Sequence, residues 1–407
     1  MTSAPPGTQA AQLDIKAAYR CIPTLFAHQP HLVVSLIDKK GDIEIFIDRC
    51  HPFGLRSSGG NLGLALDATI DILTGLLAVA FWAKWVDDII AIRHRCADGT
   101  YTVQLEDIIS WFEFLGWPLS GDKIVDFATT ITYLGFTWDF NLKTVAIPEA
   151  KREKYANRVS MWLSNARNPK CGVTREETER LLGTLVHCAF VHRTGRSFTS
   201  ATLHFLSTFP TRPSKGMSER KLRFVHRFPS HEVISDIVVW HELLCIAHAT
   251  RSLQFRPNVD PDIWVDASSE WGLAIVMHNR WRAWKLIKGW KADRRDIGWA
   301  ESVALELAIL HLIAIGYTQV NILVRSDNQG AIGQYNKGRG GNTPTNECIR
   351  RSVVALMNAS IDITPEYVPS EDNVADGPSH GRDLNNDLRL PHAFGIPEAL
   401  KSLIADV

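Results

Sequence analysis

The segment FWAKWVDDIIAI, residues 81–92, places two adjacent carboxylates inside an otherwise apolar run. Apolar residues on both sides of Asp87 and Asp88 predict two short strands that meet at a tight bend, with the acidic pair at that bend. A third carboxylate, Asp14 in QLDIKAAYR, also follows strand-like sequence. Burying carboxylates is costly without a partner, and a divalent cation is the usual partner for a group of them. The three residues therefore predict a metal site built from two separate parts of the chain.

Four more carboxylates in the second half of the chain follow the same pattern. Asp266 in IWVDASSEWG and Asp327 in ILVRSDNQGA each end a predicted strand, and Glu301 opens the predicted helix of WAESVALELA. Asp376, in EDNVADGPSH, falls in the first turn of the last predicted helix, where the helix dipole favours a negative charge. Each acid alone is more often a cap or a surface residue. Together, in this order of strands and helices, the four predict a second metal site.

The composition sets the class of protein. A length of 407 residues indicates two to four domains, and 45% hydrophobic and 22% charged residues are ordinary for a globular chain. Seven cysteines without a CxxC pair argue against disulfides or a zinc ribbon and favour an intracellular location, in the cytoplasm or nucleus. The N-terminus does not resemble a signal peptide, so secretion is not expected, and no apolar run predicts a membrane span.

The net charge of zero hides an uneven distribution. Residues 151–230 hold 16 Lys and Arg against 5 Asp and Glu, so the rest of the chain holds 28 against 39. A basic stretch between two acidic centres is what a surface that follows phosphates would need. The plainer interpretation is a pair of solvated basic helices.

The order of predicted elements divides the chain into five segments. The first is mostly β structure with a hairpin around the turn 39–42, and the second begins a run of helices, one of which opens with a capping box from Thr174 to Glu177. The fourth segment has three strands followed by alternating helices and strands, the pattern of a mixed sheet. The segments are residues 1–147, residues 148–210, a connection or linker at 211–256, residues 257–382, and a C-terminal tail at 383–407.

Five stretches of the first segment carry a family resemblance. In order they are LDIKAAYR, HPFGLRSSGG, WVDDI, GWPLSGDK and YLGFTWD, and they resemble successive motifs of reverse transcriptase palms. The chain is most similar to DIRS-like, tyrosine-recombinase-type retrotransposons of eukaryotes, over nearly its whole length. The resemblance implies an α+β palm and a helical thumb, followed by an α/β RNase H-like domain with a mixed five-stranded sheet.

The resemblance to the palm also implies roles for individual residues in RNA-directed DNA synthesis from dNTPs on a primer-template. Asp14 and Asp87 would be metal ligands, with Asp88 as the supporting carboxylate. Tyr19 would crowd the sugar 2′-position and so favour deoxynucleotides. The other implied substrate contacts are Phe53 and Gly54 beneath the incoming nucleotide, Lys123 near the triphosphate, and Tyr133, Leu134 and Gly135 in a hairpin that holds the primer end.

The resemblance to type-1 RNase H implies that Asp266, Glu301, Asp327 and Asp376 are metal ligands for cleavage of RNA in RNA/DNA hybrids. Two Mg²⁺ ions would serve each active site, with Mn²⁺ as the alternative ion. Family members often carry a His in the loop before the last Asp, but YVPSEDNVAD has none. His380 follows the last Asp and is not expected to be catalytic.

One departure leaves three functions open. Only 13 residues precede Asp14, so the fingers domain that grips the triphosphate is expected from a second chain or from a further N-terminal segment. The first function is a reverse transcriptase with RNase H activity, and the second is RNase H activity alone. The third is a domesticated nucleic-acid-binding protein without catalysis. The presence of all seven carboxylates favours an enzyme.

Overall fold

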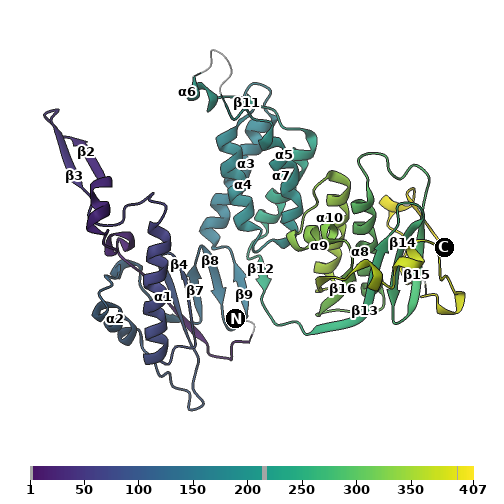
Figure 1. Ribbon diagram of the computed structural model, residues 1–407, viewed down its shortest axis with the longest axis horizontal. Helices are drawn as coiled ribbons and strands as arrows, with labels where there is room; N and C mark the ends of the chain where they lie inside the picture. The colour runs from purple at the N-terminus through teal and green to yellow at the C-terminus, as the bar shows by residue number, and fades with distance from the viewer. Residues whose placement is uncertain (1–2, 213–217, 392) are drawn as a thin grey trace. The chain divides into compact units, whose positions relative to one another are not determined.

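The computed structural model describes residues 3–212, 218–391 and 393–407. The chain divides into two compact units, one of Met1–Pro148 with Thr250–Gln254 and one of Glu149–Ala249 with Phe255–Val407 (Figure 1). All seven cysteines have free thiols, as the sequence predicts. Short 3-10 helices join the larger elements at Ala18–Cys21 (η1), Phe26–His31 (η2), Gly121–Lys123 (η3), Arg193–Thr199 (η4), Ser370–Asp372 (η5), Asn386–Leu388 (η6) and Glu398–Leu400 (η7).

The first unit is built on a four-stranded sheet with the order β4-β5-β1-β6. Its strands are β1 (Gln9–Asp14), β4 (Phe81–Trp85), β5 (Asp88–Arg93) and β6 (Val125–Ala128). Side chains alternate along these strands, so Leu13 and Ile89 are buried with the helices α1 (Ser58–Leu76) and α2 (Leu105–Phe114). Ala10 and Ile90 pack instead with Tyr133 on the opposite side.

Two further sheets complete the first unit. One has the order β12-β9-β8-β7, from Thr250–Ser252 (β12), Thr144–Ala146 (β9), Phe136–Asp139 (β8) and Thr130–Tyr133 (β7). The other is the hairpin of β2 (Val33–Ile37) and β3 (Ile43–Ile47), which is drawn apart from the main sheet in Figure 1. This hairpin was predicted at the turn 39–42, and the strand pairing confirms it.

Helices make up the first part of the second unit. They are α3 (Glu149–Arg167), α4 (Arg175–Cys188), α5 (Ser200–Ser207), α6 (Glu219–Leu222) and α7 (His231–Cys245), with the short strand pair β10 (Val173–Thr174) and β11 (His226–Arg227). The capping box between Thr174 and Glu177 is confirmed. Part of the segment 211–256, which was predicted to be a connection, forms the packed helix α7; residues 213–217 of that segment lie outside the described residues. Trp240 of α7 is fully buried, and a Cβ at Gly195 would lie 2.3 Å from its ring.

A mixed sheet with the order β17-β16-β13-β14-β15-β18 forms the rest of the second unit. The strands are β13 (Asn258–Ala267), β14 (Gly272–Met277), β15 (Arg280–Leu286), β16 (Asn321–Ser326), β17 (Asp362–Tyr367) and β18 (Ile404–Asp406). The pairs β13–β16 and β16–β17 are parallel, and the other pairs are antiparallel. The helices are α8 (Ile297–Ala314), α9 (Gln329–Lys337), α10 (Thr343–Asn358) and α11 (Asp376–Ser379).

The prediction of five strands was wrong, because the C-terminal segment adds a sixth. The described residues after 383 return to the sheet, where β18 pairs with β15 and Leu390, Leu400 and Ile404 are buried in the main core. Apolar residues spaced along the segment give it a buried face, which the prediction of a tail overlooked.

Helix α8 is the central helix of this core. By length and composition it could cross a membrane, but 72% of it is buried inside the unit. Ala300, Ala304 and Ala308 are fully buried with the sheet residues, so their small side chains allow the helix to lie close to the strands. This close approach brings Glu301 to the ends of the central strands.

Candidate metal centres

Strand pairing builds the first centre. Asp14 is the last residue of β1 and lies directly opposite Asp88, the first residue of β5. The predicted hairpin is confirmed, but its two-residue turn is Val86 and Asp87, and Asp88 is already the first residue of β5. Val86 has a φ of 58°, a conformation that is rare for a β-branched residue. The hairpin therefore holds Asp87 and Asp88 beside Asp14 at a strained bend.

A lysine compensates part of this negative charge. Lys123 Nζ donates to both carboxylate oxygens of Asp14 at 3.0 Å. Burial raises the pKa of Asp88, and the charges of Asp87 and Asp14 raise it further, whereas Lys123 lowers it. Among the residues that the structure describes, Asp14, Asp87 and Asp88 do not form a group with one oxygen from each within 4.8 Å of the others.

The predicted substrate residues of this unit fall into three places. Tyr19 and Phe53 pack edge to face with ring centroids 5.0 Å apart, and Gly54 follows with a φ of 90°. The Tyr133 hydroxyl donates to the backbone oxygen of Asp88 at 3.3 Å; burial and the Asp88 charge raise the pKa of Tyr133 to about 12, so the hydroxyl keeps its proton. Leu134 and Gly135 form the turn between β7 and β8, both with positive φ.

The second centre lies where two parallel strands end. Val265 of β13 pairs with Ser326 of β16, so the next residues, Asp266 and Asp327, are neighbours at the same edge of the sheet. Glu301 reaches them from α8, and Asp376 begins α11. The elements that carry these four acids are those that the sequence predicts, although the last helix has only four residues.

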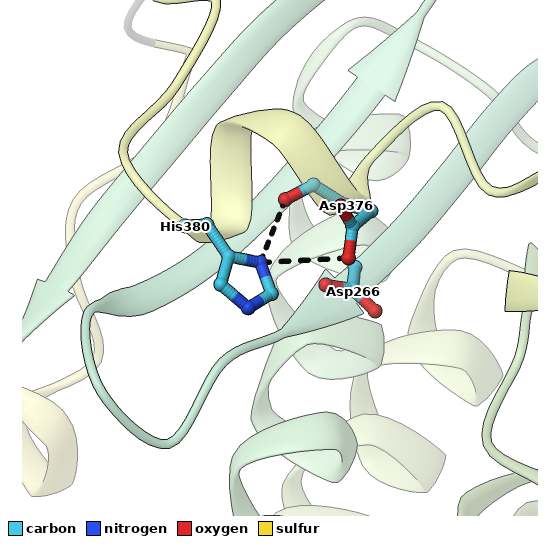
Figure 2. A group of neighbouring side chains, drawn as sticks. All are labelled: Asp266, Asp376 and His380. Carbon is cyan, nitrogen blue, oxygen red and sulfur yellow. Dashed lines mark hydrogen bonds and ion pairs between the residues drawn. The ribbon is translucent and has the colours of Figure 1, made fainter. Parts of the chain in front are cut away.

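The ligand atoms of this centre form two overlapping groups. Asp266, Glu301 and Asp327 bring one oxygen each within 4.8 Å of one another. Asp266 also forms a group of the same size with Asp376 and His380 (Figure 2). Because Asp266 belongs to both groups, its carboxylate lies between two places where a cation could bind.

Burial and mutual repulsion dominate the electrostatics here. Burial, together with the charges of Asp266 and Asp327, raises the pKa of Glu301 to about 9. The pKa of Asp266 is raised to about 6, chiefly by burial and also by the charges of Asp327 and Asp376. Glu301 is only 4% exposed, and within the described part of the chain its Oε2 has no hydrogen-bond partner.

Neighbouring side chains fix the orientation of the acids. Ser379 Oγ donates to Asp266 Oδ2, and Asn373 Nδ2 donates to Asp266 Oδ1 at 3.3 Å and to Val265 O at 3.1 Å. Arg382 Nη2 donates to Asp376 Oδ2 at 2.8 Å. In the part of the chain that the structure describes, the side chains that donate to Asp266 are those of Ser379 and Asn373, and neither is charged.

The residues present fit divalent cations. Carboxylate oxygens are the ligands that Mg²⁺ and Mn²⁺ prefer. The unpartnered oxygen of Glu301 is a buried polar atom that a bound cation would satisfy. Asp266, Glu301, Asp327 and Asp376 are thus the residues that would hold the ions.

No protein-family model and no curated protein matches this chain. It is similar to solved structures of the foamy viral protease-reverse transcriptase. The complex with an RNA/DNA hybrid has 15% identity and a TM-score of 0.42, over 90% of this chain and 45% of that one. The dRH form with double-stranded DNA has 14% identity and a TM-score of 0.43, over 91% and 59%. Another double-stranded DNA complex has 14% identity and a TM-score of 0.39, over 91% and 69%.

This chain spans about half the length of the first of these proteins, 45% of it.

Sequence reasoning missed Ser379, Asn373 and Arg382, and it expected no catalytic role for His380. Ser379 and Asn373 orient Asp266, His380 lies beside it, and Arg382 holds Asp376. All four lie within ten residues of one another, in NVADGPSHGR. The density of polar residues around Asp376 was the available signal, but it does not tell which of them turn toward Asp266.

Proposed function

We propose that this chain is an RNA-directed DNA polymerase with RNase H activity, which acts on primer-template and on RNA/DNA hybrids. The carboxylates around Asp266 support the proposal most, because three of them converge within 4.8 Å and Glu301 keeps an unpartnered buried oxygen. Each active site would use two Mg²⁺ ions, with Mn²⁺ as the alternative.

In the proposed nuclease, the residues of the chain bind the ions and orient the carboxylates that hold them. When bound, the ions supply an activated water and stabilise the charge on the leaving 3′-oxygen. Asp266 would share its carboxylate between the two positions, which is why Ser379 and Asn373 must hold both of its oxygens. Glu301 and Asp327 would bind on one side of Asp266 and Asp376 on the other.

In the proposed polymerase, the strand pairing of Asp14 with Asp88 and the turn at Asp87 supply the carboxylates. Lys123, whose side chain is 57% exposed, would exchange Asp14 for the triphosphate of a dNTP. The edge-to-face pair of Tyr19 and Phe53 would form a rigid floor for the nucleotide sugar.

The origin and location are part of the same proposal. The motifs of the palm support a DIRS-like retrotransposon element that acts in the cytoplasm or the nucleus. The alternative functions are RNase H activity alone and nucleic-acid binding without catalysis. The ion pair between Asp14 and Lys123 favours the first alternative, because it neutralises a ligand of the polymerase centre.

The nuclease is tested with a labelled RNA/DNA hybrid and Mg²⁺. The wild-type chain should cut the RNA strand, and Asp266→Asn should abolish the cut. The matched control is Asp372→Asn, because Asp372 is an exposed acid only four residues from Asp376. A wild-type chain that binds the hybrid but does not cut it would favour the non-catalytic alternative.

The polymerase is tested by primer extension with dNTPs on an RNA template. Asp87→Asn should abolish extension, whereas Asp71→Asn, at an exposed position of α1, should not. If the wild-type chain cleaves hybrids and does not extend primers, the function is RNase H alone.

A further inference from the structure

His380 lies beside two of the carboxylates at the second centre. A ring nitrogen of His380 and one oxygen each from Asp266 and Asp376 lie within 4.8 Å of one another (Figure 2). The nearest nitrogen is Nδ1, which is 3.5 Å from Asp376 Oδ1. In Figure 2 this nitrogen turns toward the carboxylates, and the other ring nitrogen turns away. The side chain was not expected to take part in the chemistry.

The spacing of these three atoms suits one ion. First-row transition ions bind nitrogen and oxygen ligands at about 2.0–2.2 Å, so two ligands of one ion can be up to about 4.4 Å apart. Small shifts of the exposed ring would bring the three atoms into that range, since the His380 side chain is 39% exposed. Arg382 occupies only Oδ2 of Asp376, which leaves Oδ1 on the side of the histidine.

A second observation at this centre supports a cation next to Asp266. Glu301 is 4% exposed, and its Oε2 has no hydrogen-bond partner in the part of the chain that the structure describes. Glu301 belongs to the other ligand group of Asp266. The centre therefore has one all-oxygen group, with Glu301 and Asp327, and one group that contains a nitrogen.

We propose that His380 is a nitrogen ligand to an ion held between Asp266 and Asp376, and that it shifts this position from Mg²⁺ toward first-row transition ions. The proposal rests on the ion site of the proposed function. Its chemical basis is ligand type: imidazole suits transition ions, whereas Mg²⁺ favours carboxylate, carbonyl and water oxygens. The all-oxygen group on the other side of Asp266 keeps the Mg²⁺ preference, so the two positions differ in the ion that they select.

The oxygens around Nδ1 of His380 act as acceptors, so in the metal-free protein this nitrogen carries the ring hydrogen, and an ion would bind it only after the hydrogen moves to Nε2. Besides Asp376 Oδ1, its Nδ1 faces Asp376 O at 3.0 Å and Ser379 Oγ at 3.2 Å. Ser379 also donates to Asp266, so the short helix α11 links the histidine and Asp266 through one hydroxyl group. This places His380 with the ligands and not on a separate surface.

The test uses the full chain with Mn²⁺ alone and no nucleic acid. Pulsed electron paramagnetic resonance of bound Mn²⁺ should show coupling to a directly bound ¹⁴N nucleus, and labelling of all histidines with ¹⁵N should replace that pattern. His380→Ala and His380→Gln should both remove the coupling. In competition titrations both variants should weaken Mn²⁺ binding by about tenfold and change Mg²⁺ binding less.

The matched control is His278→Ala, because His278 is an exposed histidine at the β14–β15 turn of the same sheet. This variant should keep the nitrogen coupling. Bound Mn²⁺ without nitrogen coupling in the wild type, or coupling that survives in His380→Ala, would overturn the proposal for His380 and leave the proposed function intact. If Asp266→Asn does not lower the number of Mn²⁺ ions bound, the ion site of the proposed function fails as well.

Discussion

The two acidic centres differ in how their negative charge is compensated. At the first, Lys123 binds both oxygens of Asp14, and Asp87 and Asp88 are half-buried at the hairpin turn. At the second, Asp266 and Glu301 are buried, and the nearby charges that act on them are carboxylates. Lys123 offsets part of the repulsion at the first centre, whereas the second contains repulsion that only protons or cations can relieve.

This contrast gives different evidence for function at each centre. Buried carboxylates without a cationic side chain are expensive to fold, so their presence indicates an external cation. A carboxylate paired with lysine has a structural explanation as well as a functional one. The nuclease part of the proposal is therefore supported by geometry, and the polymerase part depends more on the motifs.

The largest effect is expected at Glu301. Glu301→Gln keeps the shape of the side chain and removes its charge, so cleavage of RNA/DNA hybrids should fall by about 10³-fold or more, since ion binding contributes several kcal/mol to the transition state. Single-turnover cleavage with saturating enzyme measures this change. Glu371→Gln, at an exposed position of η5, is the control. If Glu301→Gln cleaves at close to the wild-type rate, Glu301 does not hold a catalytic ion. The second centre would then not differ from the first in its need for an external cation.

The pH dependence of stability should also separate the centres. The folded-state pKa of Glu301 is about 9, above its usual 4.5, and that of Asp266 is about 6, above its usual 3.8. The folded metal-free protein therefore holds these protons more tightly than the unfolded chain does. The stability that these two protonated groups contribute is fully present below their usual pKa values. It is lost progressively as the pH rises toward 9. The loss in free energy of unfolding should be on the order of a few kcal/mol.

Urea unfolding in EDTA between pH 5 and about pH 9 measures this loss. Glu301→Gln should flatten most of the dependence because it removes the group with the highest pKa. Saturating Mg²⁺ should flatten it too, since the ion stabilises the ionised carboxylates. A metal-free protein whose stability is constant over this range would show that the second centre is not under electrostatic strain.

Much of the second centre could be predicted from the sequence, because strand ends and parallel order fix backbone positions. Asp266 and Asp327 follow apolar strands, and parallel neighbours end at the same edge. The orientation of Ser379, Asn373 and His380 could not be predicted, because it depends on how a four-residue helix packs against the sheet. The sixth strand was missed because β18 has only three residues, too few for a period-two pattern to be visible.

The first centre shows a different limit of sequence reasoning. The hairpin at Asp87 and Asp88 follows from the apolar residues around it, and the pairing of Asp14 with Asp88 agrees with that prediction. The ion pair of Lys123 with Asp14 joins residues 109 positions apart, and no local pattern indicates it. Motif similarity placed Lys123 near the substrate, but only the side-chain contact shows what it neutralises.

A smaller effect is expected from removing this lysine. Lys123→Met would remove the counter-ion of Asp14 and also the proposed charged hydrogen bond to the triphosphate. Loss of one such hydrogen bond should lower primer extension by about tenfold. The pKa of Asp88 should rise further in the variant, because in the wild type the Lys123 charge lowers it. Single-turnover incorporation and a carboxyl-carbon NMR titration measure the two effects. Lys39→Met, at the exposed tip of the β2–β3 hairpin, is the control; extension that is unaffected by Lys123→Met would limit the lysine to a structural role.

The smallest effect concerns the backbone at the first centre. Val86 has a φ of 58° in the turn that presents Asp87, whereas Asp266 pairs directly with Ala274 in the β13–β14 ladder. A β-branched residue in this conformation stores about 1–3 kcal/mol of strain, and glycine would relieve it at an entropic cost of about 0.5–1 kcal/mol. Val86→Gly should therefore raise the free energy of unfolding of the first unit by about 1 kcal/mol, as measured by urea unfolding. Primer extension should fall at the same time, because a flexible turn no longer fixes Asp87 beside Asp14. If Val86→Gly instead destabilises the unit, the turn is held by the packing of the valine side chain, and strain does not distinguish the two centres.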